Sequence, residues 1–225
     1  MNYFITGCDK NTEWQLPWFV KNFRKHSKAQ LVIADFGMTT DAYMMAQIDA
    51  DHVIDEQDTK GWFSKVGTMW TATKRFPGGN YCWIDTDCQV DMNPDGIFDF
   101  VEPNKLTLVV DHPWTQNGSP WTPQSDMGPW FNTGVVAFQG CPIILQEWHS
   151  ECKREGKHRG DQEALYWLLN LGEMNRAIHI SEAPHSYNVL RLDIDQNRCP
   201  PTPPVIIHWT GRVGNEIIRK QIGDN

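Results

Sequence analysis

The sequence contains little concentrated positive charge. Acidic residues outnumber basic residues by 28 to 20, which gives a formal net charge of −8, and Lys and Arg form no block along the chain. Because binding to a nucleic-acid backbone requires a concentrated positive surface, the sequence disfavours that class of protein. An acidic chain that binds a polyanion is expected to use a divalent cation as its positive charge.

The chain also lacks paired cysteines and long apolar runs. None of its six cysteines forms a C-x-x-C pair, which excludes zinc ribbons and dithiol redox motifs. No apolar run approaches the length that spans a membrane, and residues 1–7 enter a predicted strand without the segments of a signal peptide. These absences predict reduced thiols and a cytoplasmic protein without a transmembrane segment.

Length and composition are those of an ordinary globular domain. The 225 residues are 40% apolar and 21% charged, which suits one domain with a full-sized core. Because no repeat, low-complexity tract or linker divides the chain, we expect a single domain over residues 1–225.

Strand-like and helix-like patterns alternate along the chain. Strands are predicted at residues 2–6, 30–36, 52–55, 80–85, 105–112, 130–139, 177–181 and 204–209. Helices are predicted at residues 12–27, 39–50, 61–76, 141–155 and 161–171. This order is typical of an α/β fold with a mostly parallel central sheet that helices cover on both faces. Ligands of such sheets bind beyond the carboxyl ends of the strands.

Two aspartates follow one of these buried strands directly. Asp85 and Asp87 come after the apolar residues 81–84, where an unpaired charge is costly. Three interpretations are open: a metal site, a nucleophile for phosphate transfer, or a plain acidic turn. Asp91 adds a third nearby charge, and mutual repulsion of carboxylates favours a bound cation. Oxygen ligands of this kind suit Mg²⁺ or Mn²⁺.

The acidic turn also resembles, in part, that of haloacid-dehalogenase-type phosphatases, in which the first aspartate attacks phosphorus. Those enzymes have Thr or Val two residues beyond the second aspartate, where this chain has Gln89. They also need a late G-D-x-x-x-D pair, and the stretch that begins at Gly160 ends in Leu165. These two departures make phosphatase chemistry the weaker alternative.

Five stretches together resemble a different family. "ITGCDKN", "WIDTDCQV", "WFNTGVVAF", "GDQEAL" and "IIHWTGR" occur in the order found in GT-A glycosyltransferases, most closely the retaining family 8. The resemblance implies a GT-A (Rossmann-like) domain with a nucleotide-binding half at 1–90 and a sugar- and acceptor-binding half at 91–225. It implies metal-dependent hexosyl transfer from a nucleotide-sugar donor, with UDP as the favoured nucleotide, to a carbohydrate or glycoconjugate acceptor.

The resemblance also assigns roles to individual residues. Asp85, Asp87 and His208 would hold Mn²⁺ or Mg²⁺; a buried structural histidine is the alternative for His208. The donor-binding residues would be Thr6, Gly7, Cys8, Asp9, Asn11, Asp85, Thr86, Asn132, Thr133, Gly134, Gly211 and Arg212. An ordinary strand-to-helix turn capped by Thr12 is the alternative for the first five. Family members commonly carry a lysine after the histidine, whereas Arg212 is the nearest cation here.

Asp161 and Gln162 match the acidic-Gln pair beside the transferred sugar. Asp161 would hold sugar hydroxyls, although a helix cap is the simpler interpretation of an aspartate at this position. Gln162 would lie opposite the leaving group, and an amide is a poor nucleophile. The resemblance therefore implies retention of configuration, with front-face attack by the acceptor and the departing phosphate as base. Asp111 and Asp126 are possible bases of an inverting reaction.

Eleven tryptophans are unusual for a chain of this length. Most are expected in the core, as with Trp167 on an apolar helix face. A long polar segment carries Trp114 and Trp121 and ends beside Trp130, and it is predicted to be a mobile cover and the acceptor site.

Two further alternatives remain open. A sugar nucleotidylyltransferase shares the expected fold, but it favours a glycine-rich, basic loop after the first strand; residues 6–14 contain one glycine and one lysine. A non-catalytic carbohydrate-binding protein would tolerate loss of the metal ligands, all three of which this chain retains.

Overall fold

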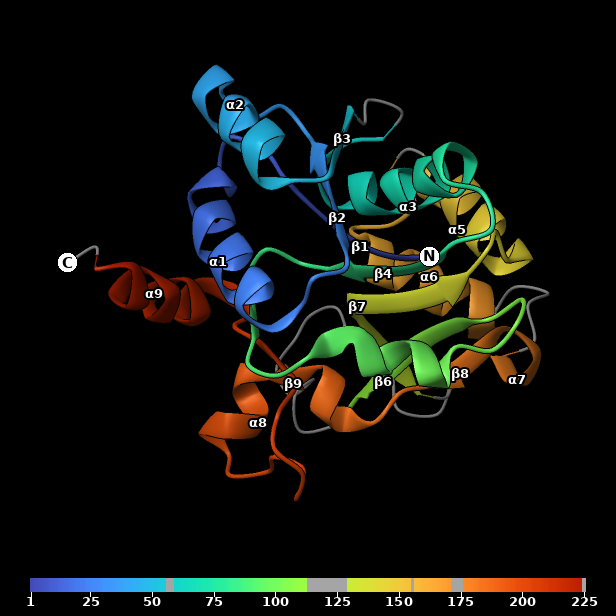
Figure 1. The fold of residues 1–225 in the computed structure, drawn as a ribbon. Coiled ribbons are helices and arrows are strands. Elements are labelled where there is room, and N and C mark those ends of the chain that lie inside the picture. Colours follow the sequence, from blue (N-terminus) through green and yellow to red (C-terminus); the bar gives the residue numbers. More distant parts are fainter. Residues whose placement is uncertain (56–58, 113–128, 155, 171–175, 224–225) are drawn as a thin grey trace.

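A computed structural model describes residues 1–55, 59–112, 129–154, 156–170 and 176–223. In this part of the chain seven strands form one sheet, in the order β3-β2-β1-β4-β7-β6-β8 (Figure 1). Their bounds are β1 Asn2–Cys8, β2 Gln30–Asp35, β3 His52–Asp55, β4 Asn80–Ile84, β6 Leu106–Asp111, β7 Trp130–Gln139 and β8 Ile180–Glu182. β7 runs antiparallel to both its neighbours, and the other pairs are parallel. The predicted α/β fold with a mostly parallel sheet is confirmed.

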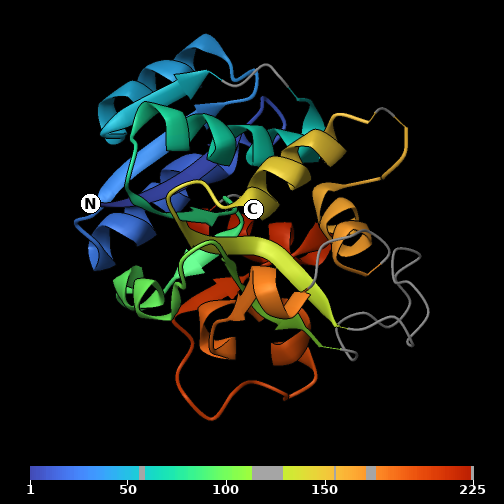
Figure 2. The same cartoon turned by 90° about the vertical axis from the view of Figure 1, so that its right-hand side faces the viewer.

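Alternate residues of the central strands face opposite sides of the sheet. Phe4 of β1 belongs to one buried cluster and Ile5 to the other, and Cys82 and Trp83 of β4 divide in the same way. On the first face lies α1 (Leu16–His26). The second face is covered by α3 (Ser64–Arg75), α5 (Ile143–Cys152) and α6 (Asp161–Asn170), with α5 in the middle (Figure 2).

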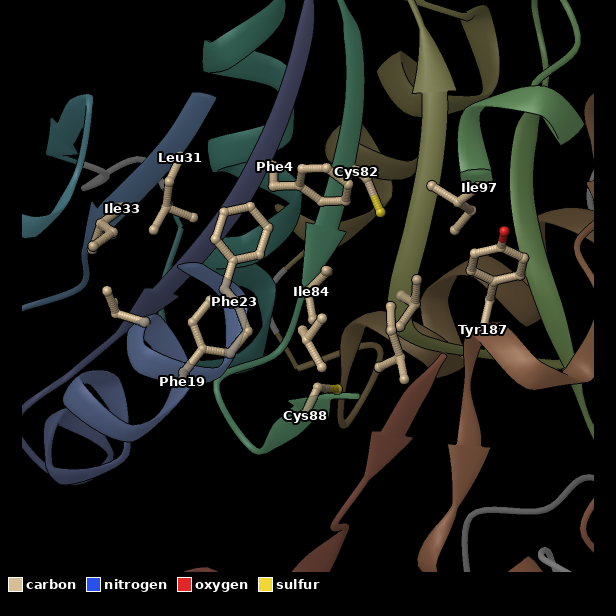
Figure 3. Close-up of a cluster of buried hydrophobic side chains, with 14 of the residues drawn as sticks. Phe4, Phe19, Phe23, Leu31, Ile33, Cys82, Ile84, Cys88, Ile97 and Tyr187 are labelled. Carbon is tan, nitrogen blue, oxygen red and sulfur yellow. The ribbon is translucent and has the colours of Figure 1, made fainter. Parts of the chain in front are cut away.

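The core of the first face is built from aromatic and aliphatic side chains. Phe19 and Phe23 of α1 meet Phe4 and Leu31 from the strands, and all four are fully buried (Figure 3). Burial of each such side chain contributes about 1.5–3 kcal/mol. This packing makes the central strands a rigid base for the residues at their ends.

A second, smaller sheet lies next to the end of β4. β10 (Ile206–His208) pairs antiparallel with β5 (Cys88–Val90) and parallel with β9 (Val189–Leu190). In this register His208 lies opposite Cys88, one residue beyond Asp87. The small sheet therefore brings a histidine from the late part of the chain to the acidic turn.

The remaining elements are short apart from two helices. They are η1 Glu13–Gln15, α2 Thr40–Asp49, η2 Gly61–Phe63, η3 Pro94–Phe100, α7 Arg176–His179, η5 His185–Tyr187, α8 Arg191–Asp195 and α9 Gly211–Ile222. No helix in the described ranges is long and apolar enough to cross a membrane.

Two local predictions were wrong. The pattern at 177–181 predicted a strand, but α7 occupies residues 176–179 and the strand β8 begins only at Ile180. Thr12 does not cap the first α-helix, because α1 begins at Leu16 with Pro17 in its first turn. The Thr12 hydroxyl instead donates to Asp9 Oδ1 at 2.9 Å.

Candidate active site

Asp85 and Asp87 lie just beyond the carboxyl end of β4, as the sequence predicted. The backbone N–H of Asp85 donates to Gly134 O on β7 at 2.9 Å, and Trp83 Nε1 donates to Asp85 Oδ1 at 2.6 Å. These bonds hold the carboxylate in one place. Burial raises the pKa of Asp85, Lys65 opposes that shift, and the neighbouring charge of Asp87 adds to it.

Lys65 joins two acidic residues from different parts of the chain. Its Nζ lies 3.2 Å from Asp85 Oδ1 and 3.3 Å from Asp161 Oδ2, and it donates to Thr133 O at 3.2 Å. Although burial alone would lower the pKa of Lys65, Asp161 and Asp85 raise it, so the side chain is a cation at neutral pH. A buried positive charge therefore lies in direct contact with the Asp85 carboxylate of the acidic turn.

Both ring nitrogens of His208 face oxygen atoms. Nε2 lies 3.1 Å from Asp87 Oδ1 and 3.9 Å from Asp85 Oδ2, and Nδ1 lies 3.2 Å from Asn188 Oδ1. A neutral ring carries one N–H, so its other nitrogen would present a lone pair to an oxygen. Burial alone would lower the pKa of His208, but the neighbouring Asp87 carboxylate raises it. One nitrogen can donate its N–H to an oxygen, but the other needs either an additional proton or a divalent cation between it and its oxygen. The imidazole of His208 and the carboxylates of Asp87 and Asp85 are suitable ligands for such a cation.

Cys88 is a further potential metal ligand near Asp87 and His208. Ligand atoms of Asp87, Cys88 and His208 all lie within 4.8 Å of one another, the one such set in the described residues. Cys88, however, lies among the core side chains beside Ile84, and burial raises the pKa of its thiol well above the usual range (Figure 3). A protonated thiol is a poor ligand, and Mg²⁺ and Mn²⁺ prefer oxygen. Asp85 is the better third ligand.

A cleft of about 300 Å³ opens beside these groups. Its walls include Gly7, Cys8, Asp9, Thr12, Gln15, Phe36, Gly61, Trp62, Lys65, Trp83, Asp85, Thr86, Asp87, Gly211 and Asn215. Seven of these residues were predicted to bind donor or metal. They come from the ends of β1 and β4 and from the start of α9, which the fold brings together at one edge of the sheet.

Other predicted donor-binding residues have different surroundings. Thr6 is fully buried, the Asn11 amide donates to Asp9 Oδ2 at 2.8 Å, and the Arg212 side chain is 90% exposed. Partial burial alone would raise the pKa of Asp9, but hydrogen bonds from Asn11 and Thr12 lower it. The Asp9 carboxylate therefore organises the turn after β1.

Gly7 is required for a reason that the sequence did not reveal. A Cβ there would collide with the protein itself, because Phe36 Cζ would lie at 2.7 Å and Ala34 Cβ at 2.9 Å. The glycine lets Phe36 close over the end of β1.

The "FNTG" segment supports the site from β7. Asn132 Oδ1 accepts from Gly134 N at 2.9 Å, and the Thr133 hydroxyl donates to Asp161 Oδ2 at 2.7 Å. A Cβ on Gly134 would lie 2.2 Å from His208 Cε1. Asn132 and Thr133 thus orient neighbouring side chains, and Gly134 leaves room for the histidine ring.

Asp161 and Gln162 begin α6 at the same edge. Asp161 is buried, and its carboxylate pairs with Lys65 and Thr133. Gln162 Nε2 donates to Asp111 Oδ2 at 3.1 Å, while its Oε1 accepts from Thr133 N at 3.4 Å. The structure therefore places Asp111 directly beside the amide; Asp126 lies outside the described residues.

Two tryptophans differ from the predictions, whereas Trp83 and Trp148 are buried in the core as expected. Trp130 is buried at 7% exposure and packs on Tyr166, with ring centroids 4.7 Å apart. Trp167, expected in the core, is 36% exposed. The predicted cover spans residues 113–130, of which 113–128, with Trp114 and Trp121, lie outside the described residues.

Lys65, Asn188 and Trp62 are among the residues of the site that sequence reasoning missed. Lys65 carried a signal, since it stands among apolar residues of a predicted helix. Asn188 stands between buried residues without any motif. Trp62 lines the cleft although it is 65% exposed.

No protein-family model matches the sequence, and no curated protein is significantly similar to it. Solved structures do match. The galactosyltransferase LgtC, in complex with donor and acceptor sugar analogues, has a TM-score of 0.63 at 14% identity, over 99% of this chain and 95% of that one. Glycosyltransferase GlyE of Streptococcus pneumoniae TIGR4 has a TM-score of 0.66 at 15% identity, over 94% of this chain and 56% of that one.

A third match is a glycosyltransferase involved in glycosylation of the major capsid of PBCV-1. Its TM-score is 0.59 at 13% identity, over 99% of this chain and 98% of that one. At these identities the likeness shows the fold. The chain has the GT-A fold that the sequence predicted, while the finer resemblance to family 8 stays a prediction.

Proposed function

We propose that the protein is a metal-dependent glycosyltransferase that moves a sugar from a nucleotide-sugar donor to a carbohydrate or glycoconjugate acceptor. One observation carries the proposal: Nε2 of His208 faces Asp87 Oδ1 at 3.1 Å, and Asp87 lines a cleft in a glycosyltransferase fold. A cation fits between these two side chains, and the adjoining cleft has room for a ligand.

Asp87, His208 and Asp85 would hold Mn²⁺ or Mg²⁺. When bound, the cation would neutralise charge on the leaving nucleoside diphosphate. The base and ribose would lie against the cleft wall made by Gly7, Cys8 and Asp9. UDP is the favoured nucleotide by family resemblance.

Lys65 would hold the Asp161 carboxylate in place beside the sugar. Its ammonium contacts both Asp161 and Asp85, so the sugar-side and metal-side carboxylates share one counter-charge. Asp161 would accept hydrogen bonds from sugar hydroxyls with its remaining lone pairs. Sugar position and charge balance at the metal site would then depend on the same lysine.

We propose retention of configuration. An inverting reaction needs a base that takes the acceptor proton during in-line attack. Gln162, the residue expected opposite the leaving group, is an amide held between Thr133 N and Asp111 Oδ2. Front-face attack, with the departing phosphate as base, does not require that amide to act as a nucleophile.

A screen of nucleotide sugars tests the proposal. Mn²⁺-dependent hydrolysis or transfer should occur with at least one UDP-sugar and stop when EDTA is added. Proton NMR of the first-formed product from a UDP-α-sugar should show an α-linkage, and Gln162→Ala should slow transfer while donor binding persists. A β-linked product would contradict retention and would make Asp111 the favoured base.

A further inference from the structure

We propose that Asn188 is a positioning residue that directs Nε2 of His208 toward the divalent cation. In this arrangement Asn132, fixed by the backbone of Gly134, sets the orientation of Asn188. The inference rests on the proposed function, because it concerns the cation assigned to Asp87 and His208.

The orientation begins at a backbone donor. Gly134 N donates to the side chain of Asn132 at 2.9 Å. A backbone N–H can only donate, so the amide oxygen of Asn132, and not its nitrogen, must face it. Asn132 is 8% exposed, so solvent offers little competition for this bond.

Asn188 receives its orientation from the same oxygen. Asn188 Nδ2 donates to Asn132 Oδ1 at 2.9 Å. The reverse orientation would set two amide oxygens against each other, so the Asn188 oxygen is directed to the other side. There it lies 3.2 Å from Nδ1 of His208. Asn188 is 1% exposed, so water cannot easily replace either partner.

The Asn188 oxygen in turn selects the nitrogen that His208 can offer. It accepts a hydrogen bond from the N–H at Nδ1, which leaves the lone pair of Nε2 to bind a cation beside Asp87. Metal-binding histidines commonly donate their other N–H to such an oxygen, and loss of that partner lowers metal affinity roughly 10–100-fold. The chain Gly134–Asn132–Asn188–His208 has this form.

The test compares Mn²⁺ binding by calorimetry, without substrate, in four proteins. Asn188→Leu and Asn132→Leu remove the oxygens and should lower the affinity about 10–100-fold relative to wild type. Asn132→Asp still accepts from both Gly134 N and Asn188 Nδ2, and should bind Mn²⁺ nearly as tightly as wild type. Thermal unfolding in EDTA checks that each variant is folded.

The outcomes separate the inference from the proposed function. Wild-type affinity in Asn188→Leu overturns the positioning role and leaves the metal site intact. Equal losses of Mn²⁺ affinity in Asn132→Asp and Asn132→Leu would indicate a packing effect and would also overturn the positioning role. If Asn188→Leu does not fold, the comparison of these two Asn132 variants is the test. A wild-type protein that binds no Mn²⁺ removes the metal assignment, and the inference with it.

Discussion

Lys65 holds together two carboxylates that come from different parts of the chain. Asp85 follows β4 and Asp161 begins α6, and each lies within 3.3 Å of the ammonium. Because the Lys65 side chain is only 10% exposed, the three charges depend on one another more than a surface pair would.

Replacing Lys65 with Met should lower the free energy of unfolding by about 3–5 kcal/mol, because the buried Asp161 and the partly buried Asp85 lose their partner. Urea denaturation at neutral pH measures the loss. The double variant Lys65→Met with Asp161→Asn should recover part of it. Lys74→Met, at an exposed lysine of the same helix, should cost no more than about 1 kcal/mol; an equal cost at both positions would contradict the ion-pair explanation.

Gly134→Ala should weaken Mn²⁺ binding at least about tenfold, because the new methyl would require the His208 ring to move. Calorimetric titration measures the change. Gly160→Ala is the matched control: its methyl would meet Trp62 Cε3 at 3.2 Å, away from the histidine. Unchanged Mn²⁺ affinity in Gly134→Ala would show that His208 is not a ligand.

Short elements decide the geometry of the site more than long ones do. β5 and β10 each have three residues, yet their pairing sets His208 opposite Cys88 and next to Asp87. The long strand β7 supports this arrangement from the main sheet through Gly134 O, which accepts from Asp85 N. The proposed metal site thus lies where the two sheets adjoin.

The end of α5 depends on a buried acidic residue. The Glu151 carboxylate is 6% exposed and contacts Arg154, Lys157 and His158. Burial alone would raise the pKa of Glu151, but its hydrogen bonds with His158 and Lys157 lower it. A carboxyl group with a lowered folded-state pKa stabilises the protein above its unfolded-state pKa, and that stability is lost as the pH falls through the folded-state pKa.

Glu151→Gln should therefore lower the free energy of unfolding by about 1–3 kcal/mol at neutral pH. The difference from wild type should shrink as the pH falls below the folded-state pKa of Glu151, because the wild-type residue then becomes neutral as well. Urea denaturation across an acid pH series measures it. A difference that stays constant with pH would contradict the electrostatic explanation.

At the scale of the whole molecule, the negative net charge makes a cation at the cleft important for any anionic ligand. The formal charge of −8 repels a nucleoside diphosphate. Lys65 is the one cationic residue among the described residues that line the cleft. A divalent ion would supply the missing positive charge.

UDP and Mn²⁺ together should stabilise the folded protein. At a ligand concentration of 100 times Kd the gain is about 2.7 kcal/mol, which for a chain of this size raises Tm by about 5–10 °C. Asp87→Ala should abolish the shift, and Asp91→Ala should retain it, because Asp91 Oδ1 instead accepts from Gln89 Nε2. Equal shifts in both variants would contradict the assignment of Asp87.

The sequence by itself determined the layers of the fold and the position of the acidic turn. The short apolar runs within residues 2–6 and 30–36, with an amphipathic segment between them, are local patterns, and local patterns predict strands, helices and the points where they end. Asp85 and Asp87 could therefore be placed at a strand end. The resemblance of the five stretches added His208 and the GT-A fold.

Only the tertiary structure decided which distant groups meet. The antiparallel direction of β7, the pairing of β5 with β10, the contact of Lys65 with Asp161 and the bond from His208 to Asn188 join segments far apart in the chain. Such contacts depend on register and packing between elements, and no periodicity within one element encodes them. For that reason Asn188 carried no signal in the sequence, while its neighbours in space give it a definite orientation.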